Sequence, residues 1–204
     1  MDFIHILILS AIQGITEFLP ISSQSHLILT SAFLGMKDQG LGFDIALHSG
    51  SLFAILIYYR KEIAKILSVS NEGIQYLKLI IIGSIPLPLI GLLFIDIVSI
   101  NMRSVTSIAL MTIVFALILY IADVRKKENI SSLTSISMFT IIFIGFMQTL
   151  AIMPGVSRAG IVITAALLAN YSREDSIKIA FLLSIPAIFM ATVYQSMQLY
   201  GVGD

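Results

Sequence analysis

Apolar residues dominate this 204-residue chain, and polar residues interrupt them at two places. In the first, apolar arms at about Ile4–Leu19 and Ser25–Leu34 flank Pro20 and a run of polar residues. The residue before a proline is driven out of helical geometry, so Leu19 is predicted to end a helix. The second arm is shorter than the ~20 residues that a membrane-spanning helix needs. The pattern therefore predicts a re-entrant hairpin whose polar tip lies near the middle of a membrane.

Longer apolar runs predict membrane-spanning helices. They are Phe43–Tyr59, Tyr76–Val98, Val105–Val124 and Ser176–Tyr200. Pro86 and Pro88 predict a kink in the second of these helices. The second polar interruption, MPGVSRAG, separates apolar arms at Ser135–Leu150 and Gly160–Leu168, and predicts a second hairpin.

The second interruption repeats the first at a shift of 134 residues. This shift places Pro20 on Pro154 and Ser23 on Ser157 without a gap. Three predicted spanning helices lie between the hairpins, so the second hairpin enters from the opposite face. We expect one all-α integral membrane domain over residues 1–204, a helical bundle with two re-entrant hairpins in an inverted-topology repeat. The first repeat is expected at about 1–66, the linking helices at about 76–124 and the second repeat at about 135–200.

Composition supports a membrane protein. Hydrophobic residues make up 57% of the chain and charged residues 12%, and the mean hydropathy is +0.98. A soluble domain carries about 25% charged residues. The chain has no cysteine, which excludes disulfides and thiolate metal sites. Its formal net charge of zero gives no reason to expect a nucleic-acid partner.

The distribution of cations predicts the orientation. One predicted face carries nine lysines and arginines, and the other carries two, Lys37 and Arg103. The nine are Arg60, Lys61, Lys65, Lys78, Arg125, Lys126, Lys127, Arg173 and Lys178. Cytoplasmic loops carry an excess of such residues, so the first hairpin is predicted to open outward and the second toward the cytoplasm.

Three ionisable residues stand inside the two interruptions: Glu17 and His26 in the first, and Arg158 in the second. Ionisable groups at membrane depth are costly and mark functional sites by default. If the two tips meet, Arg158 approaches Glu17 and His26. A structural ion pair between Arg158 and Glu17 is the simpler alternative. His48 is expected to be a polar residue of helix packing.

The residue types around these groups fit the hydrolysis of a phosphate ester. Arginine offers a planar fork of donors for phosphate oxygens, and amides at a helix N-terminus add to it. His26, Ser22 and Ser23 supply candidate nucleophiles or proton-transfer groups. Glu17 could hold a divalent cation that bridges phosphate oxygens. The apolar part of such a substrate could stay in lipid.

The segments QGITEFLPISSQSH and PGVSRAG together resemble the undecaprenyl pyrophosphate phosphatase family, the bacitracin-resistance proteins. The resemblance covers almost the whole chain. It implies a multi-pass enzyme of the bacterial cytoplasmic (inner) membrane that removes the terminal phosphate from undecaprenyl pyrophosphate, which regenerates the lipid carrier of cell-wall synthesis. It also implies an active site toward the outer face and a divalent cation, Mg²⁺ or Ca²⁺.

The resemblance also assigns residues. It implies catalytic roles for Glu17, Ser23, His26 and Arg158. Metal binding is expected at Glu17 and Gln13. Substrate binding is expected at Ser22, Gly155, Ser157, Arg158 and Thr164. The chain departs from the family at Ala159 and Val162, where the family has serine and threonine, so two hydroxyls near the phosphate are lost.

Two other interpretations stay open. Hairpins that open to opposite faces also suit a transporter or flippase for a polyprenyl phosphate or a small anion, although a fold alone does not establish a function. An inactive relative that serves as a binding subunit is the third possibility. Family chains usually continue through about two more spanning helices, so we expect a homodimer or another partner in addition to the polyprenyl pyrophosphate substrate and membrane lipid.

Overall fold

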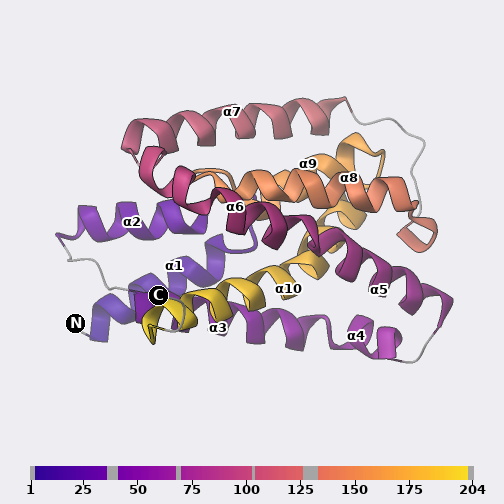
Figure 1. The fold of residues 1–204 in the computed structure, drawn as a ribbon, viewed down its shortest axis with the longest axis horizontal. Helices are drawn as coiled ribbons and strands as arrows, with labels where there is room; N and C mark the ends of the chain where they lie inside the picture. The colour runs from indigo at the N-terminus through magenta and orange to yellow at the C-terminus, as the bar shows by residue number, and fades with distance from the viewer. Residues whose placement is uncertain (1–2, 36–40, 68–69, 103, 126–132, 202–204) are drawn as a thin grey trace.

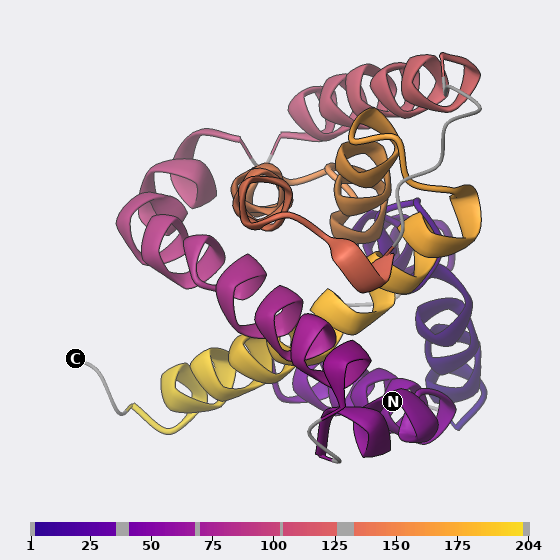
Figure 2. The same ribbon diagram turned by 90° about the vertical axis from the view of Figure 1, so that its right-hand side faces the viewer.

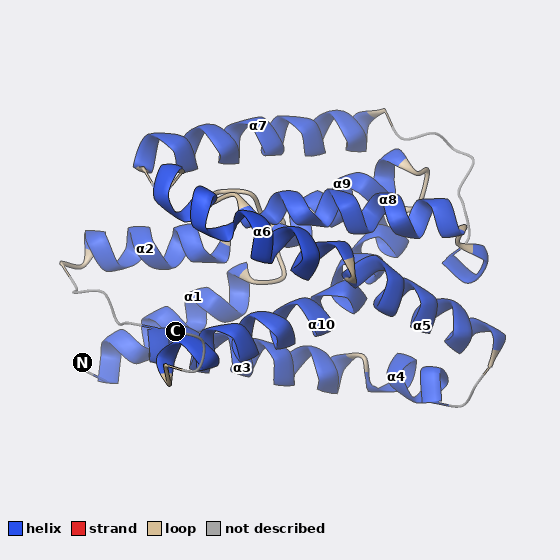
Figure 3. Ribbon diagram, viewed as in Figure 1, coloured by secondary structure: helices blue, strands red, loops and turns tan. Residues whose placement is uncertain are grey.

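Helices are the regular elements of the computed structural model, which describes residues 3–35, 41–67, 70–102, 104–125 and 133–201 (Figure 3). The α-helices are α1 (Phe3–Thr16), α2 (Ser23–Phe33), α3 (Leu41–Tyr58), α4 (Arg60–Leu67), α5 (Asn71–Ser84), α6 (Pro86–Asn101), α7 (Val105–Val124), α8 (Met138–Thr149), α9 (Arg158–Leu168) and α10 (Arg173–Leu199). Two short 3₁₀ helices, η1 (Leu133–Ser135) and η2 (Leu150–Ile152), flank α8. The described residues contain no strand, so the all-α prediction is confirmed.

Several helices can cross a membrane. Among the described residues, three are long and apolar enough: Asn71–Phe94, Val105–Val124 and Arg173–Leu199. A fourth span is formed if α3 and α4, which are bent by 71° at Tyr59, count as one. The kink predicted at Pro86 is confirmed, because α5 ends at Ser84 and α6 begins at Pro86. The chain is therefore a multi-pass membrane protein.

The two hairpins begin and end at residues other than those predicted. Helix α1 ends at Thr16 rather than Leu19, which places Glu17 just beyond the helix. Helices α2 and α9 begin two residues earlier than predicted, because Ser22 and Ser157 cap them. A serine hydroxyl at this position accepts an amide hydrogen bond and starts the helix. The apolar pattern does not report such polar caps.

The helices suggest the same repeat as the sequence. Helices α2 and α9 are both eleven residues long, and their caps, Ser22 and Ser157, lie 135 residues apart, one more than the predicted shift. In Figure 1 the α1–α2 pair and the α8–α9 pair open toward opposite ends of the molecule, and their breaks lie in the middle. Their placement in a bilayer, and the inverted repeat, stay predictions.

The positions that carry the charge bias are only partly described. Arg60, Lys61 and Lys65 lie on α4, Arg125 follows α7, and Arg173 opens α10, all toward the same end of the molecule (Figure 1). Lys37, Arg103, Lys126 and Lys127 lie outside the described residues.

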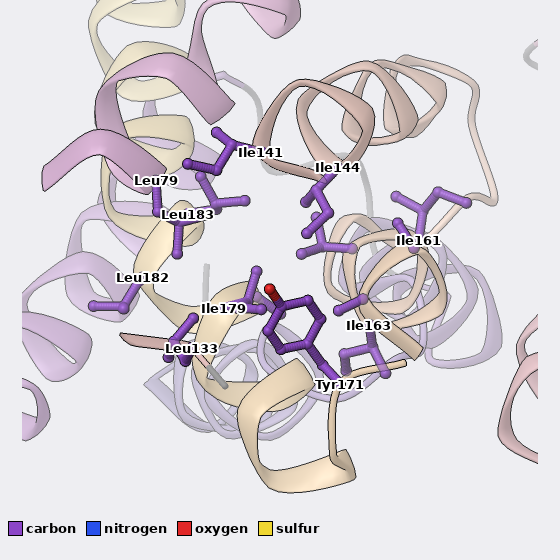
Figure 4. Packing of buried hydrophobic residues seen from close by; sticks show 14 of the residues in the cluster. Leu79, Leu133, Ile141, Ile144, Ile161, Ile163, Tyr171, Ile179, Leu182 and Leu183 are labelled. Atoms are coloured by element: carbon purple, nitrogen blue, oxygen red, sulfur yellow. The ribbon is translucent and has the colours of Figure 1, made fainter. Parts of the chain in front are cut away.

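The main hydrophobic core surrounds the second hairpin. Leu79, Ile144, Ile179 and Leu183 are among its fully buried members (Figure 4). Figure 2 shows α8 almost end-on among its neighbours, which include α5, α6 and α9. Nine consecutive residues of α9, Ala159–Leu167, are buried, whereas Leu27 alone is buried in α2, a helix that is fully described. The second hairpin is therefore the more firmly packed of the two.

A close crossing of α5 and α8 offers a test of this packing. A Cβ atom at Gly145 would lie 2.6 Å from the backbone oxygen of Gly83. We expect Gly145→Ala to lower the free energy of unfolding by about 1–3 kcal/mol, the usual cost of overpacking. Gly50→Ala is the matched control, because no atom lies within 4 Å of its added Cβ. Thermal unfolding in detergent measures both variants, and equal melting temperatures would contradict the crossing.

Candidate active site

The two polar interruptions meet in the middle of the molecule. Arg158 Nη2 donates a hydrogen bond to Glu17 Oε1 at 2.7 Å. Ser157 Oγ donates to the backbone oxygen of Leu19 at 3.4 Å, which joins the same two breaks. The Glu17 side chain is 6% exposed and that of Arg158 is 16% exposed. The predicted approach of Arg158 to Glu17 is therefore observed.

Glu17 is the centre of the polar cluster. Its Oε2 accepts hydrogen bonds from Ser23 Oγ at 2.7 Å and from Gln13 Nε2 at 3.0 Å. His48 Nε2 lies 3.9 Å from the same oxygen. Gln13 precedes Glu17 by four residues and so lies on the same side of the chain. Four side chains from α1, α2, α3 and α9 thus converge on one carboxylate.

A cavity of about 270 Å³ opens beside this cluster. Its polar lining is Glu17, Ser22, Ser23, Gln24, His48, Ser157 and Arg158. Its apolar lining is Ile21, Leu87, Ala151, Ile152, Val156, Ala187, Ile188 and Ala191. Ligand pockets usually measure about 300–1,000 Å³, so this cavity suits a polar head group and the first part of an apolar chain.

Arg158 has donor capacity to spare. Its Nη1 is buried and has no hydrogen-bond partner in the described structure. An unpaired buried donor is costly, and an anion in the cavity would satisfy it. Arg158 is also the first residue of α9, where backbone amides lack partners within the helix. The guanidinium and the helix start together make a candidate anion site at the cavity.

Some residues expected at the site lie elsewhere. Glu17, Ser22, Ser23, Ser157 and Arg158 line the cavity, as expected. His26 does not line it, and its Nδ1 lies 2.7 Å from the backbone oxygen of Ser22. Gln13 donates a hydrogen bond to Glu17 but does not line this cavity. It lines a second cavity of about 240 Å³ between α1 and α3.

Gly155 and Thr164 have packing roles in this structure. Gly155 has φ +94, and a Cβ there would collide with the backbone oxygen of Ile108 on α7. Thr164 is 1% exposed and donates its hydroxyl to the backbone oxygen of Gly160 at 2.7 Å. Neither residue lines the cavity. Their expected roles in substrate binding stay predictions, which this geometry does not support.

The two departures from the family motif also fall on buried positions. Ala159 is 4% exposed and Val162 is 1% exposed. Neither residue lines the cavity. The lost hydroxyls therefore leave its lining unchanged.

His48 is the site residue that sequence reasoning missed. It lies on α3, lines the cavity and approaches Glu17, rather than serving helix packing alone. The available signal was its position in an apolar run, since an ionisable group inside a spanning segment marks function by default.

A divalent cation fits the ligands around Glu17 in part. Carboxylate and amide oxygens suit hard cations, and Gln13 Oε1 is buried without a hydrogen-bond partner in the described structure. Arg158 already neutralises the carboxylate and opposes a second positive charge. The described residues contain no group of three His, Cys, Asp or Glu side chains that could hold a metal ion. Glu17 and Gln13 are thus the core of a ligand set that needs further donors.

Comparison with known proteins agrees with the two motifs. The sequence matches the family described as "Bacitracin resistance protein BacA" over residues 6–203. It is 44% identical to the undecaprenyl-diphosphatase of Teredinibacter turnerae over 211 residues. That alignment covers 98% of this chain and 78% of the relative. It is 42% identical over 213 residues to undecaprenyl-diphosphatase 1 of Pseudoalteromonas translucida, and the alignment covers 100% of this chain and 79% of that protein. The undecaprenyl-diphosphatase of Saccharophagus degradans is 42% identical over 207 residues, and the alignment covers 98% of this chain and 78% of that protein.

Proposed function

The chain belongs to the bacitracin resistance protein BacA family, and we propose that the cavity between Glu17 and Arg158 is its active site. Its activity is that of its relatives: it hydrolyses undecaprenyl diphosphate to undecaprenyl phosphate and so recycles the lipid carrier of cell-wall synthesis. These similarities do not favour the transporter or flippase interpretation.

The mixed polar and apolar lining of the cavity carries the proposal. Arg158, Ser157 and the start of α9 would bind the terminal phosphate, and the unpartnered Nη1 supplies a donor for it. Leu87, Ile152 and Ile188 would contact the first isoprene units. The remainder of the polyprenyl chain would stay in lipid, because the cavity is too small to hold it.

The nucleophile that we propose is Ser23. Its hydroxyl donates to Glu17 Oε2 at 2.7 Å, the arrangement of a nucleophile beside its general base. Glu17 takes the hydroxyl proton while Oγ forms a bond to the terminal phosphorus. The bond from that phosphorus to the bridging oxygen breaks, and undecaprenyl phosphate leaves with the electron pair. Water then cleaves the phosphoserine, which releases inorganic phosphate and restores the hydroxyl.

A divalent cation and His26 are two further expected participants in the reaction. Glu17 and Gln13 would hold a divalent cation, whose chemistry is to neutralise charge on the phosphate oxygens. His26 keeps a candidate role in proton transfer by resemblance to the family, although it lies outside the cavity lining. Ser23 is placed better, because it touches both the cavity and the carboxylate.

Phosphate release from undecaprenyl diphosphate tests the site. Arg158→Gln and Ser23→Ala should each lower the rate about 100-fold or more, since they remove the charge-stabilising group and the nucleophile. Thr164→Val should change the rate by less than about threefold, because its hydroxyl bonds only within α9. Thermal unfolding confirms that each variant folds. Near-normal turnover by a well-folded Arg158→Gln would sink the proposed phosphate site.

We propose that the enzyme lies in the bacterial inner membrane with its active site toward the outer face. Arg60, Lys61, Lys65, Arg125 and Arg173 lie toward the end of the molecule that carries α4 and the start of α10, and such an excess marks the cytoplasmic side. Ser104 caps the start of α7, which lies at the opposite end of the molecule (Figure 1). The first hairpin opens toward this second end (Figure 1).

Single cysteines can test the orientation, because the chain has none of its own. Ser104→Cys in whole cells should react with a membrane-impermeant thiol reagent, since it is expected outside. Lys61→Cys, an exposed position on α4, should react only after the cells are opened. The opposite labelling pattern would reverse the assigned orientation.

We also propose a homodimer that covers the first break. Leu19 and Pro20 are exposed and line neither cavity, whereas no residue of the second break, 150–157, is exposed. Irregular backbone that faces lipid is costly unless protein or a wet cavity covers it. A second copy would provide that cover.

Cross-linking tests the dimer. Leu19→Cys should form a disulfide between two copies in native membranes, because this position is expected at the interface. Leu117→Cys on α7 is the control; Leu117 is 57% exposed and Leu19 is 45% exposed. A monomeric mass in mild detergent together with no cross-link from Leu19→Cys would rule the dimer out.

A further inference from the structure

The mouth of the active-site cavity can be located from the exposure of the residues that line it. The Glu17 side chain is 6% exposed and that of Arg158 is 16% exposed. The exposed residues of the described lining are Ile21, Gln24 and Ala191. The charged pair therefore lies in the inner part of the cavity, and these three residues lie nearest its mouth.

Gln24 is the polar residue at this mouth, beside the apolar Ile21 and Ala191. It is the second residue of α2, which Ser22 caps at the first break. Its carboxamide supplies N–H donors without a net charge. The positive end of the α2 dipole adds to the attraction for an anion there. The mouth therefore offers a neutral hydrogen-bond donor to an anionic group.

A prenyl diphosphate carries two phosphate groups in a row ahead of its apolar chain. The terminal phosphate is the one proposed to bind Arg158, whose Nη1 is buried without a partner in the described structure. The apolar chain has to leave through the mouth, because a cavity of about 270 Å³ is too small to hold it. The phosphate linked to that chain therefore lies between Arg158 and the mouth, where Gln24 lies.

We propose that Gln24 donates its side-chain N–H to this chain-linked phosphate, and that it is the residue by which the protein distinguishes a prenyl diphosphate from a prenyl monophosphate. The inference rests on the proposed active site and assigns a donor to the second half of the diphosphate. When the bond between the terminal phosphorus and the bridging oxygen breaks, that oxygen keeps the electron pair on the chain-linked phosphate. A donor at this phosphate therefore both binds the substrate and stabilises the leaving group.

The charges of the lining account for the selectivity. Among the described residues of the lining, Arg158 is the single lysine or arginine. A diphosphate can contact Arg158 and Gln24 together, whereas a single phosphate group can occupy one of the two positions. A neutral donor also holds an anion less strongly than a cation does. The monophosphate product is therefore released more readily than it would be if both positions carried a positive charge.

The test compares the binding of methylenediphosphonate and of orthophosphate to the purified chain in detergent, measured by isothermal titration calorimetry. Gln24→Ala should weaken methylenediphosphonate binding about 10-fold, the scale of one lost hydrogen bond to a charged group. It should change orthophosphate binding by less than about twofold, because that ion is expected at Arg158. Gln24→Glu keeps the shape but places a negative charge beside the phosphate, so it should weaken methylenediphosphonate binding further.

Two further variants complete the comparison. Arg158→Gln should weaken the binding of both ligands, since it removes the charge at the terminal phosphate. Gln198→Ala is the matched control, because Gln198 is an exposed glutamine of α10 that does not line the cavity, and it should leave both affinities unchanged. Thermal unfolding confirms that each variant folds.

The outcomes separate this inference from the active site on which it rests. Unchanged methylenediphosphonate affinity in folded Gln24→Ala and Gln24→Glu, with weaker binding by Arg158→Gln, would overturn the role of Gln24 and leave the phosphate site at Arg158. An equal loss of both ligands in Gln24→Ala would also overturn it, because the effect would then not depend on the second phosphate. Binding of neither ligand by the unmodified chain would overturn the phosphate site and the inference together.

Discussion

The ion pair between Glu17 and Arg158 is the contact on which the site depends. Each charge is mostly removed from solvent in a strongly apolar protein, where an unpaired ion would be costly. Pairing them requires that breaks separated by 141 residues come together. The helix ends place both residues at the breaks. Helix α1 ends one residue before Glu17, and α9 begins at Arg158 because Ser157 caps it. Helical hydrogen bonding thus continues almost to the charged pair on both sides.

The two hairpins contribute unequally to the molecule. Helix α9 buries nine consecutive residues and lies in the main core, whereas the first hairpin packs through a small cluster of Leu9, Leu27 and Leu47. Elements that carry function are often drawn from the less stable part of a protein. Here the lightly packed hairpin carries Glu17 and Ser23, and the rigid one presents Arg158. The side that we propose to bind phosphate is therefore the more firmly packed one.

Much of this architecture could be read from the sequence, because the physical signals are local. A mean hydropathy of +0.98 requires a membrane environment, and a proline inside an apolar run requires a break. The cost of placing Glu17 and Arg158 at membrane depth identified them as site residues before their distance was known. The Pro and Ser pairs of the repeat indicated that the two breaks are related, although their alignment differs by one residue from that of the helix caps.

Tertiary packing decided which neighbours of these residues reach the cavity. His26 ends the first motif and Thr164 follows the second by four residues, yet His26 lies off the cavity lining and Thr164 is enclosed in α9. His48 lies in an apolar helix with no motif around it, yet the packing of α3 against α1 carries it to Glu17. The direction of a side chain depends on the rotation of its helix against other helices, which residues distant in sequence determine. The sequence by itself therefore determined the membrane fold, the two breaks and the charged pair, while the ring of groups around that pair was settled only by how the helices pack.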